Sequence, residues 1–143
     1  MQKTLIALSL SLAAGTVLAQ ATPVGLWKTI DDETKVEKSL VRITESGGVL
    51  SGRVEKILEA AKADAKCDKC SDARKDQPVQ GMTILRNARA DAEREHWEGG
   101  DILDPNNGKV YKLRLKPLDG GKKLEVRGYI GPFFRNQQWI RVE

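Results

Sequence analysis

Strict alternation of apolar and polar side chains is the feature of this sequence that most restricts its fold. It is clearest in residues 109–116, where Tyr111, Leu113 and Leu115 share one face while lysine and arginine occupy the other. A period of two places one face of an extended strand in a core and the other in solvent. The pattern recurs in residues 25–30, 39–45, 49–57, 81–88, 95–103, 123–130 and 137–143. The sequence therefore predicts eight strands.

Short turn sequences separate many of these strands. Residues 45–48, 104–108 and 119–121 are rich in Gly, Asn, Asp and Pro, which favour tight turns. Short links make consecutive strands antiparallel neighbours. We therefore expect an all-β protein whose eight antiparallel strands close into a barrel, with an open sandwich as the alternative. The side chains expected to face the interior are Tyr111, Leu113, Leu115, Leu124 and Val126.

Two charged stretches interrupt the strand pattern. Residues 55–66 are rich in Ala, Lys, Glu and Asp, and residues 86–95 are dense in Arg, Ala, Asp and Glu. Either stretch could form a short helix or the extended end of a hairpin. We interpret both as solvated connections.

The first residues are typical of an export signal. Lys3 precedes an uncharged, leucine- and alanine-rich segment at residues 5–18, which is too short for a permanent membrane span. We expect cleavage after Ala19, and no lipid anchor, because Gln20 stands where an anchor requires cysteine. This predicts a signal at residues 1–19 and a single domain at residues 20–143, working in a bacterial periplasm.

The charges argue against nucleic acid as a partner. The chain has 24 Lys and Arg against 20 Asp and Glu, a net charge of +4. Both signs alternate along the chain, without the one-sign block that a nucleic-acid surface shows. We interpret most of these charges as a solvated surface.

Cys67 and Cys70 are the only cysteines and are separated by two residues. In an oxidising compartment, a disulfide that braces a long loop is the default. A redox-active pair is the first alternative, since nearby lysines favour a thiolate. A zinc site is the second, although it would need ligands beyond these two cysteines and the single histidine.

The sequence offers little sign of catalysis. His96 is the only histidine, so any hydrolytic triad would have to include it, and no Gly-x-Ser-x-Gly pattern is present. We expect a protein that is not an enzyme, with no catalytic residue, no metal and no cofactor.

Tryptophans stand at both ends of the predicted barrel. Trp27 lies in the first strand and Trp139 in the last, and closure makes these strands neighbours. Arg135 or Arg141 could then stack on an indole ring. The cluster is expected either to plug one end of the barrel or to contact a ligand.

Several motifs, taken in order, give the chain a family resemblance. They are Gly25-Leu26-Trp27, Cys67-Asp68-Lys69-Cys70, the stretch from Arg74 to Val79, the stretch from Trp97 to Pro105, Gly108 to Tyr111, Val126 to Gly131 and Gln137-Gln138-Trp139. Residues 20–143 thereby resemble the exported bacterial family called domain of unknown function 2147. That resemblance implies a lipocalin-like barrel, and Gly25-x-Trp27 is similar to the lipocalin opening motif.

Together these observations predict a binding protein for a small apolar or amphipathic molecule. The candidate ligand-binding residues are Trp27, Tyr111, Arg127, Tyr129, Arg135 and Trp139. One alternative is a protein-interaction module or inhibitor in the cell envelope, which an exposed pair at Phe133 and Phe134 would favour. The other is a thiol redox protein based on Cys67 and Cys70.

Overall fold

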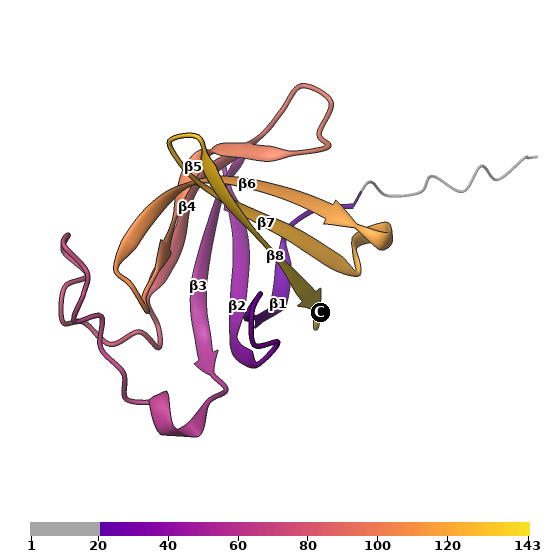
Figure 1. The fold of residues 1–143 in the computed structure, drawn as a ribbon. Coiled ribbons are helices and arrows are strands. Elements are labelled where there is room, and N and C mark those ends of the chain that lie inside the picture. The colour runs from indigo at the N-terminus through magenta and orange to yellow at the C-terminus, as the bar shows by residue number, and fades with distance from the viewer. Residues whose placement is uncertain (1–20) are drawn as a thin grey trace, which may run out of the picture.

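Eight antiparallel strands form a closed barrel in the computed structural model, which describes residues 21–143 (Figure 1). Each strand pairs with the next one along the chain, and β1 pairs with β8 to close the sheet. The strands are β1 (Gly25–Ile30), β2 (Glu37–Ser46), β3 (Val49–Ile57), β4 (Thr83–Ala90), β5 (Trp97–Asp104), β6 (Lys109–Leu118), β7 (Lys123–Ile130) and β8 (Phe133–Arg141). The predicted barrel is therefore confirmed, whereas the expected signal at residues 1–19 lies outside the described residues.

The alternation seen in the sequence sets the two faces of the sheet. On β6 and β7, Leu113, Leu115, Leu124 and Val126 are buried, and Leu115 lies opposite Val126 in the strand register. Their neighbours along each strand point outward, as a period of two requires. Four strands begin elsewhere than the sequence predicted. β8 begins at Phe133 rather than residue 137, β4 at Thr83 rather than 81, β5 at Trp97 rather than 95, and β2 at Glu37 rather than 39.

The two charged stretches adopt different conformations. In residues 55–66, β3 continues to Ile57 and a single turn of 3-10 helix, η1 (Ala60–Lys62), follows. In residues 86–95, β4 extends to Ala90 and the chain reverses at Asp91, whose carboxylate accepts the Glu95 N–H at 2.9 Å. The first stretch therefore contains a short helix, and the second is a hairpin end.

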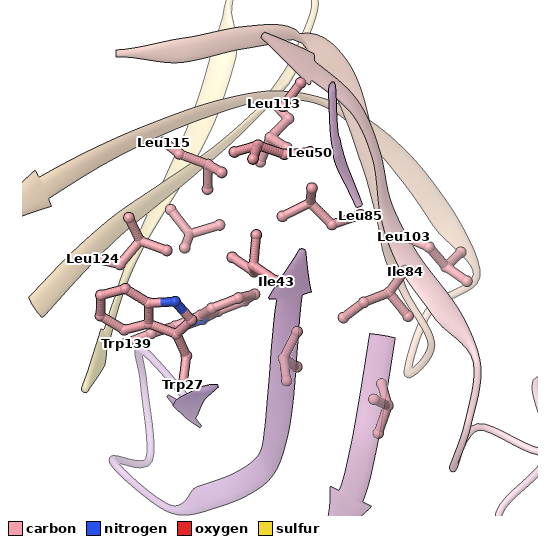
Figure 2. Packing of buried hydrophobic residues seen from close by; sticks show 14 of the residues in the cluster. Trp27, Ile43, Leu50, Ile84, Leu85, Leu103, Leu113, Leu115, Leu124 and Trp139 are labelled. Atoms are coloured by element: carbon pink, nitrogen blue, oxygen red, sulfur yellow. The ribbon is translucent and has the colours of Figure 1, made fainter. Parts of the chain in front are cut away.

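One end of the barrel is filled by large side chains. Trp27 is fully buried, and its Nε1 donates to the Pro23 carbonyl at 2.7 Å. Trp139, on the neighbouring strand β8, is 2 % exposed, and Leu115 and Leu124 pack in the same region (Figure 2). The chain segments before β1 and after β8 meet at this closed end, as do the β2–β3, β4–β5 and β6–β7 connections.

The opposite end carries the long connection between β3 and β4, residues 58–82 (Figure 1). Cys67 and Cys70 form a disulfide within it, with their Cα atoms 5.4 Å apart, and both residues are buried. This connection rests on the β5–β6 turn, where Gly108 lies so close that a Cβ atom would stand 1.9 Å from the Lys69 carbonyl oxygen. The predicted disulfide is confirmed, and it braces the loop at the open end.

Candidate ligand-binding site

A cavity of about 650 Å³ occupies the open half of the barrel. Its deep walls are apolar and come from five different strands. They include Val54 of β3, Ile84 of β4, Leu103 of β5, Val126 of β7 and Trp139 of β8. This volume lies within the range of about 300–1,000 Å³ typical of small-molecule sites. Figure 2 shows Ile84 and Leu103 on one side of the interior and Trp139 on the other.

The mouth of the cavity is polar and strongly charged. Loops β1–β2, β3–β4 and β5–β6 meet there with the beginning of β8. The charged side chains that line it are Lys38, Lys62, Lys66, Lys69, Arg135, Asp31, Glu59, Asp68 and Asp104. An apolar interior below a charged rim suits a molecule with one apolar and one polar end.

Glu59 binds two of the rim lysines. Its Oε1 lies 2.9 Å from Lys38 Nζ, and its Oε2 lies 3.4 Å from Lys62 Nζ. The hydrogen bond from Lys38 lowers the pKa of Glu59, and the same bond raises the pKa of Lys38. Glu59 and Lys38 therefore stay charged around neutral pH, and the two lysines share Glu59 as a counterion.

Arg135 links β8 to the β1–β2 turn across the mouth. Its Nη2 donates to Asp32 Oδ1 at 2.6 Å, and its Nη1 lies 3.9 Å from Asp104 Oδ2. The hydrogen bond from Arg135 lowers the pKa of Asp32, so this carboxylate is ionised at any physiological pH. The arginine thus sets the spacing between two edges of the rim.

Neutral polar groups stand on the wall between the rim and the apolar depth. The Thr29 and Ser39 hydroxyls are 2.8 Å apart, and Asn107 Nδ2 donates to the Tyr111 hydroxyl at 2.9 Å. Tyr111 can lie against the wall because residue 128 is glycine: a Cβ atom there would be 3.0 Å from Tyr111 Cβ. The Tyr111 hydroxyl accepts from Asn107, and its own O–H can still act as a donor.

Three of the six candidate ligand-binding residues line the cavity: Tyr111, Arg135 and Trp139. Trp27 lies beneath the cavity in the packed end, under the Arg141 guanidinium. Arg127 and Tyr129 lie on the outer face of β7, where the Arg127 guanidinium stacks 4.6 Å from the centre of the Phe134 ring.

The interior residues expected from the sequence divide between the two halves. Tyr111 and Val126 line the cavity, whereas Leu113, Leu115 and Leu124 belong to the packed core. The barrel is therefore filled by its own side chains at one end and hollow at the other.

Sequence reasoning missed the lysines of the rim. Lys62, Lys66 and Lys69 belong to the β3–β4 connection. Lys62 and Lys66 fall within residues 55–66, which were interpreted as a solvated connection, and Lys69 lies just beyond them. The available signal was the density of lysine around the cysteine pair. Its position over the barrel mouth depends on contacts between segments distant in sequence.

His96 lies away from the cavity, at the β4–β5 hairpin. Its Nδ1 is 3.4 Å from Asp91 Oδ2, and its Nε2 is 2.8 Å from Arg114 Nη2. Within residues 21–143, no group of three or more His, Cys, Asp or Glu side chains is arranged to hold a metal ion.

Comparisons with known proteins agree with this architecture. A family model described as an uncharacterised protein conserved in bacteria, DUF2147, matches residues 25–141. The solved structure of protein HP1028 from Helicobacter pylori, described as belonging to the lipocalin family, superposes with a TM-score of 0.73 at 17 % identity. The match covers 86 % of this chain and 84 % of that one, and it shows the fold. None of the helices in the part of the chain that the structure describes is long and apolar enough to span a membrane.

Proposed function

The chain belongs to the bacterial family DUF2147, and from that premise and its half-hollow lipocalin-like barrel we propose that it binds a small apolar or amphipathic molecule in the cavity. The observation that carries this proposal is the division of the barrel interior. Side chains as large as Trp27 and Leu124 fill one end, while about 650 Å³ remains between apolar walls at the other. Binding of an apolar ligand in a cavity of this size is favourable, because apolar surface of both the ligand and the cavity walls is removed from water.

The proposal places binding, rather than catalysis, at this site. The polar groups around it form a rim of ion pairs and hydroxyls, which can orient a ligand and keep its polar end in water. We also propose that the protein works outside the cytoplasm, in a bacterial periplasm. The composition of residues 1–19 supports this, and a disulfide between Cys67 and Cys70 fits an oxidising compartment.

Native mass spectrometry of protein purified from its own cell envelope tests both points. A chain beginning at Gln20 with a small-molecule adduct that is lost on denaturation would support export and binding. A full-length chain in the cytoplasmic fraction would reject export. Extraction of the adduct in organic solvent would identify its chemical class.

A cavity-filling variant provides the control. Val126→Phe places a larger side chain in the cavity wall and should abolish the adduct. Val142→Phe makes the same change at a residue that is 49 % exposed at the closed end, and should leave the adduct in place. Equal adduct levels in both variants, with both folded, would reject the cavity as the binding site.

A second candidate function is a protein-interaction module in the envelope, and the exposed aromatic pair on β8 favours it. Phe133 is 76 % exposed and Phe134 is 56 % exposed, and adjacent exposed aromatic residues are common at interfaces. A Phe133→Ser/Phe134→Ser variant should lose a partner that in-cell crosslinking detects with the unaltered protein, while its cavity still binds the ligand. An unchanged crosslinking pattern would reject this candidate.

A further inference from the structure

Two lysines at the cavity mouth have no counterion among residues 21–143. Of the five basic residues that line the cavity, Lys38 and Lys62 share Glu59, and Arg135 binds Asp32. Across residues 21–143, by contrast, no carboxylate lies within 4.0 Å of Lys66 Nζ or Lys69 Nζ.

The backbone that carries these lysines is held in place. Cys67, between them in sequence, donates its N–H to the Gln77 carbonyl at 2.9 Å and accepts the Asp76 N–H at 2.8 Å. The disulfide joins Cys67 to Cys70, and Lys66 forms a β-bridge with Pro78. Contact between Lys69 and Gly108 fixes the other side of the loop against the β5–β6 turn. The backbone positions from which both lysine side chains extend are therefore fixed at the cavity mouth.

Most of the rim carboxylates have partners other than Lys66 and Lys69. Glu59 is engaged by lysine, and Asp104 accepts the Asn106 N–H at 2.9 Å and lies near Arg135. Asp31 accepts the backbone N–H groups of Glu33 and Thr34 at 3.0 and 2.8 Å, within its own turn. Asp68, between the two lysines in sequence, is the remaining carboxylate that lines the mouth. Counted with Asp32, the rim carboxylates equal the basic residues in number, so the excess of positive charge is local to Lys66 and Lys69.

We infer that the cavity takes a single-chain amphiphile with an anionic head group, its hydrocarbon chain between the apolar walls and its head group at Lys66 and Lys69. This inference rests on the function proposed above, since it names the class of ligand for the same cavity. A negatively charged head supplies the counterion that both lysines lack, and it can stay hydrated at the rim. Desolvation of the head group is then avoided while the chain is buried.

Titration calorimetry at low ionic strength with four 12-carbon probes tests the inference. The probes are dodecanoate, dodecyl phosphate, dodecanol and dodecylammonium, each below its micelle concentration. Two exposed ion pairs predict that dodecanoate binds about threefold to tenfold more tightly than dodecanol, with dodecylammonium weakest. The ratio of dodecanoate to dodecyl phosphate distinguishes a carboxylate ligand from a phosphate ligand.

Variants assign any preference to the two lysines. Lys66→Gln/Lys69→Gln should bring dodecanoate to the affinity of dodecanol and leave dodecanol itself unchanged. Lys56→Gln/Lys122→Gln removes the same charge from exposed residues outside the cavity lining and should retain the preference.

The outcomes separate the inference from the function on which it rests. Equal or tighter binding of dodecylammonium, or a preference that survives in Lys66→Gln/Lys69→Gln, overturns the anionic head group and leaves the cavity function intact. Failure of all four probes to bind the folded protein overturns the proposed function as well.

Discussion

The guanidinium carbon of Arg141 lies 4.2 Å from the centre of the Trp27 ring, so the last strand covers the first tryptophan of the barrel. The same guanidinium donates to the carbonyls of Thr22, Val24 and Gly121. Burial lowers the pKa of Arg141. The ordinary pKa of arginine is so high that the group nevertheless remains charged. One side chain thus joins the segment before β1, the β6–β7 turn and the closed end of the core.

Replacement of Arg141 by Ala should destabilise the protein by about 2–4 kcal/mol. The variant leaves three carbonyls without their donor and removes the cation–π contact with Trp27. Urea unfolding followed by circular dichroism measures the change. Arg141→Lys keeps the charge but not the forked geometry of the guanidinium group. Its stability is expected to lie between those of the unaltered protein and Arg141→Ala. Arg89→Ala, at an exposed position, should shift the free energy of unfolding by less than about 0.5 kcal/mol. An equally small effect in Arg141→Ala would contradict this account.

Gly108→Ala should disturb the loop that carries the rim lysines. Gly108 has φ +72°, and a Cβ atom there would lie 1.9 Å from the Lys69 carbonyl oxygen. Gly47→Ala is the matched control, because Gly47 has φ +57° with no atom within 4 Å of an added Cβ. In the control, the positive φ alone should lower the free energy of unfolding by about 1 kcal/mol. In Gly108→Ala the decrease should be about 3 kcal/mol.

Hydrogen exchange distinguishes this effect from general loss of stability. In Gly108→Ala, amide protection around Cys67–Cys70 should fall, because the connection must move away from the β5–β6 turn. In Gly47→Ala that protection should be unchanged. Equal behaviour of the two variants would show that the close contact is unimportant.

Acid should remove a stabilising contribution from Asp72. The hydrogen bond from Arg74 lowers the pKa of Asp72 to about 2, and Arg74 Nη1 also donates to the Thr83 carbonyl at 3.0 Å. A pKa that is lower in the folded than in the unfolded state stabilises the folded protein above about pH 4. This contribution to the free energy of unfolding is lost between about pH 4 and pH 2, as Asp72 becomes protonated. Because Asp72 is partly exposed, we expect about 1 kcal/mol or less.

The variant Asp72→Asn checks that sign. It should be less stable than the unaltered protein at pH 7, and the two should converge as the pH approaches 2. Asp64→Asn, at an exposed residue of the same connection, should differ by less than about 0.5 kcal/mol. If the difference in free energy of unfolding between the unaltered protein and Asp72→Asn became larger at low pH, the prediction would be wrong.

The disulfide should resist reduction while the protein is folded. Cys67 is fully buried and Cys70 is 3 % exposed, and exchange requires a thiolate to reach a sulfur atom. We expect millimolar dithiothreitol to leave the bridge intact in the native protein and to reduce it in urea, as measured by alkylation and mass spectrometry. Rapid reduction in the native state would instead favour the thiol redox alternative.

Periodicity predicted the strands well where one face is buried, and poorly where neither is. Residues 109–116 alternate clearly because Leu113 and Leu115 are buried in the barrel. The first residues of β8, from Phe133 to Asn136, are all exposed, so no alternation marked them as a strand. The same period placed Arg127 and Tyr129 opposite Leu124 and Val126, and hence on the outer face. Their aromatic and cationic character had suggested a ligand contact.

The cavity itself could not be predicted from alternation. Inward positions in the open half include Val54, Val126 and Gly128, whereas the closed half has Trp27 and Leu124. Both halves follow one polarity pattern, and the open half also carries large side chains such as Tyr111 and Trp139. The space between the walls therefore depends on how these side chains pack in three dimensions. The rim lysines were harder still, because their connection lacks periodicity and is positioned by the disulfide and Gly108.

Because Trp27, Arg141 and the chain segments that they join fill one end of the barrel, the cavity in residues 21–143 opens at the other end, between Arg135 and Lys69. An amphiphile held in the orientation inferred above would enter this opening with its chain first and leave with its head group first. The charged side chains of the rim would then be the last groups that it contacts on the way out.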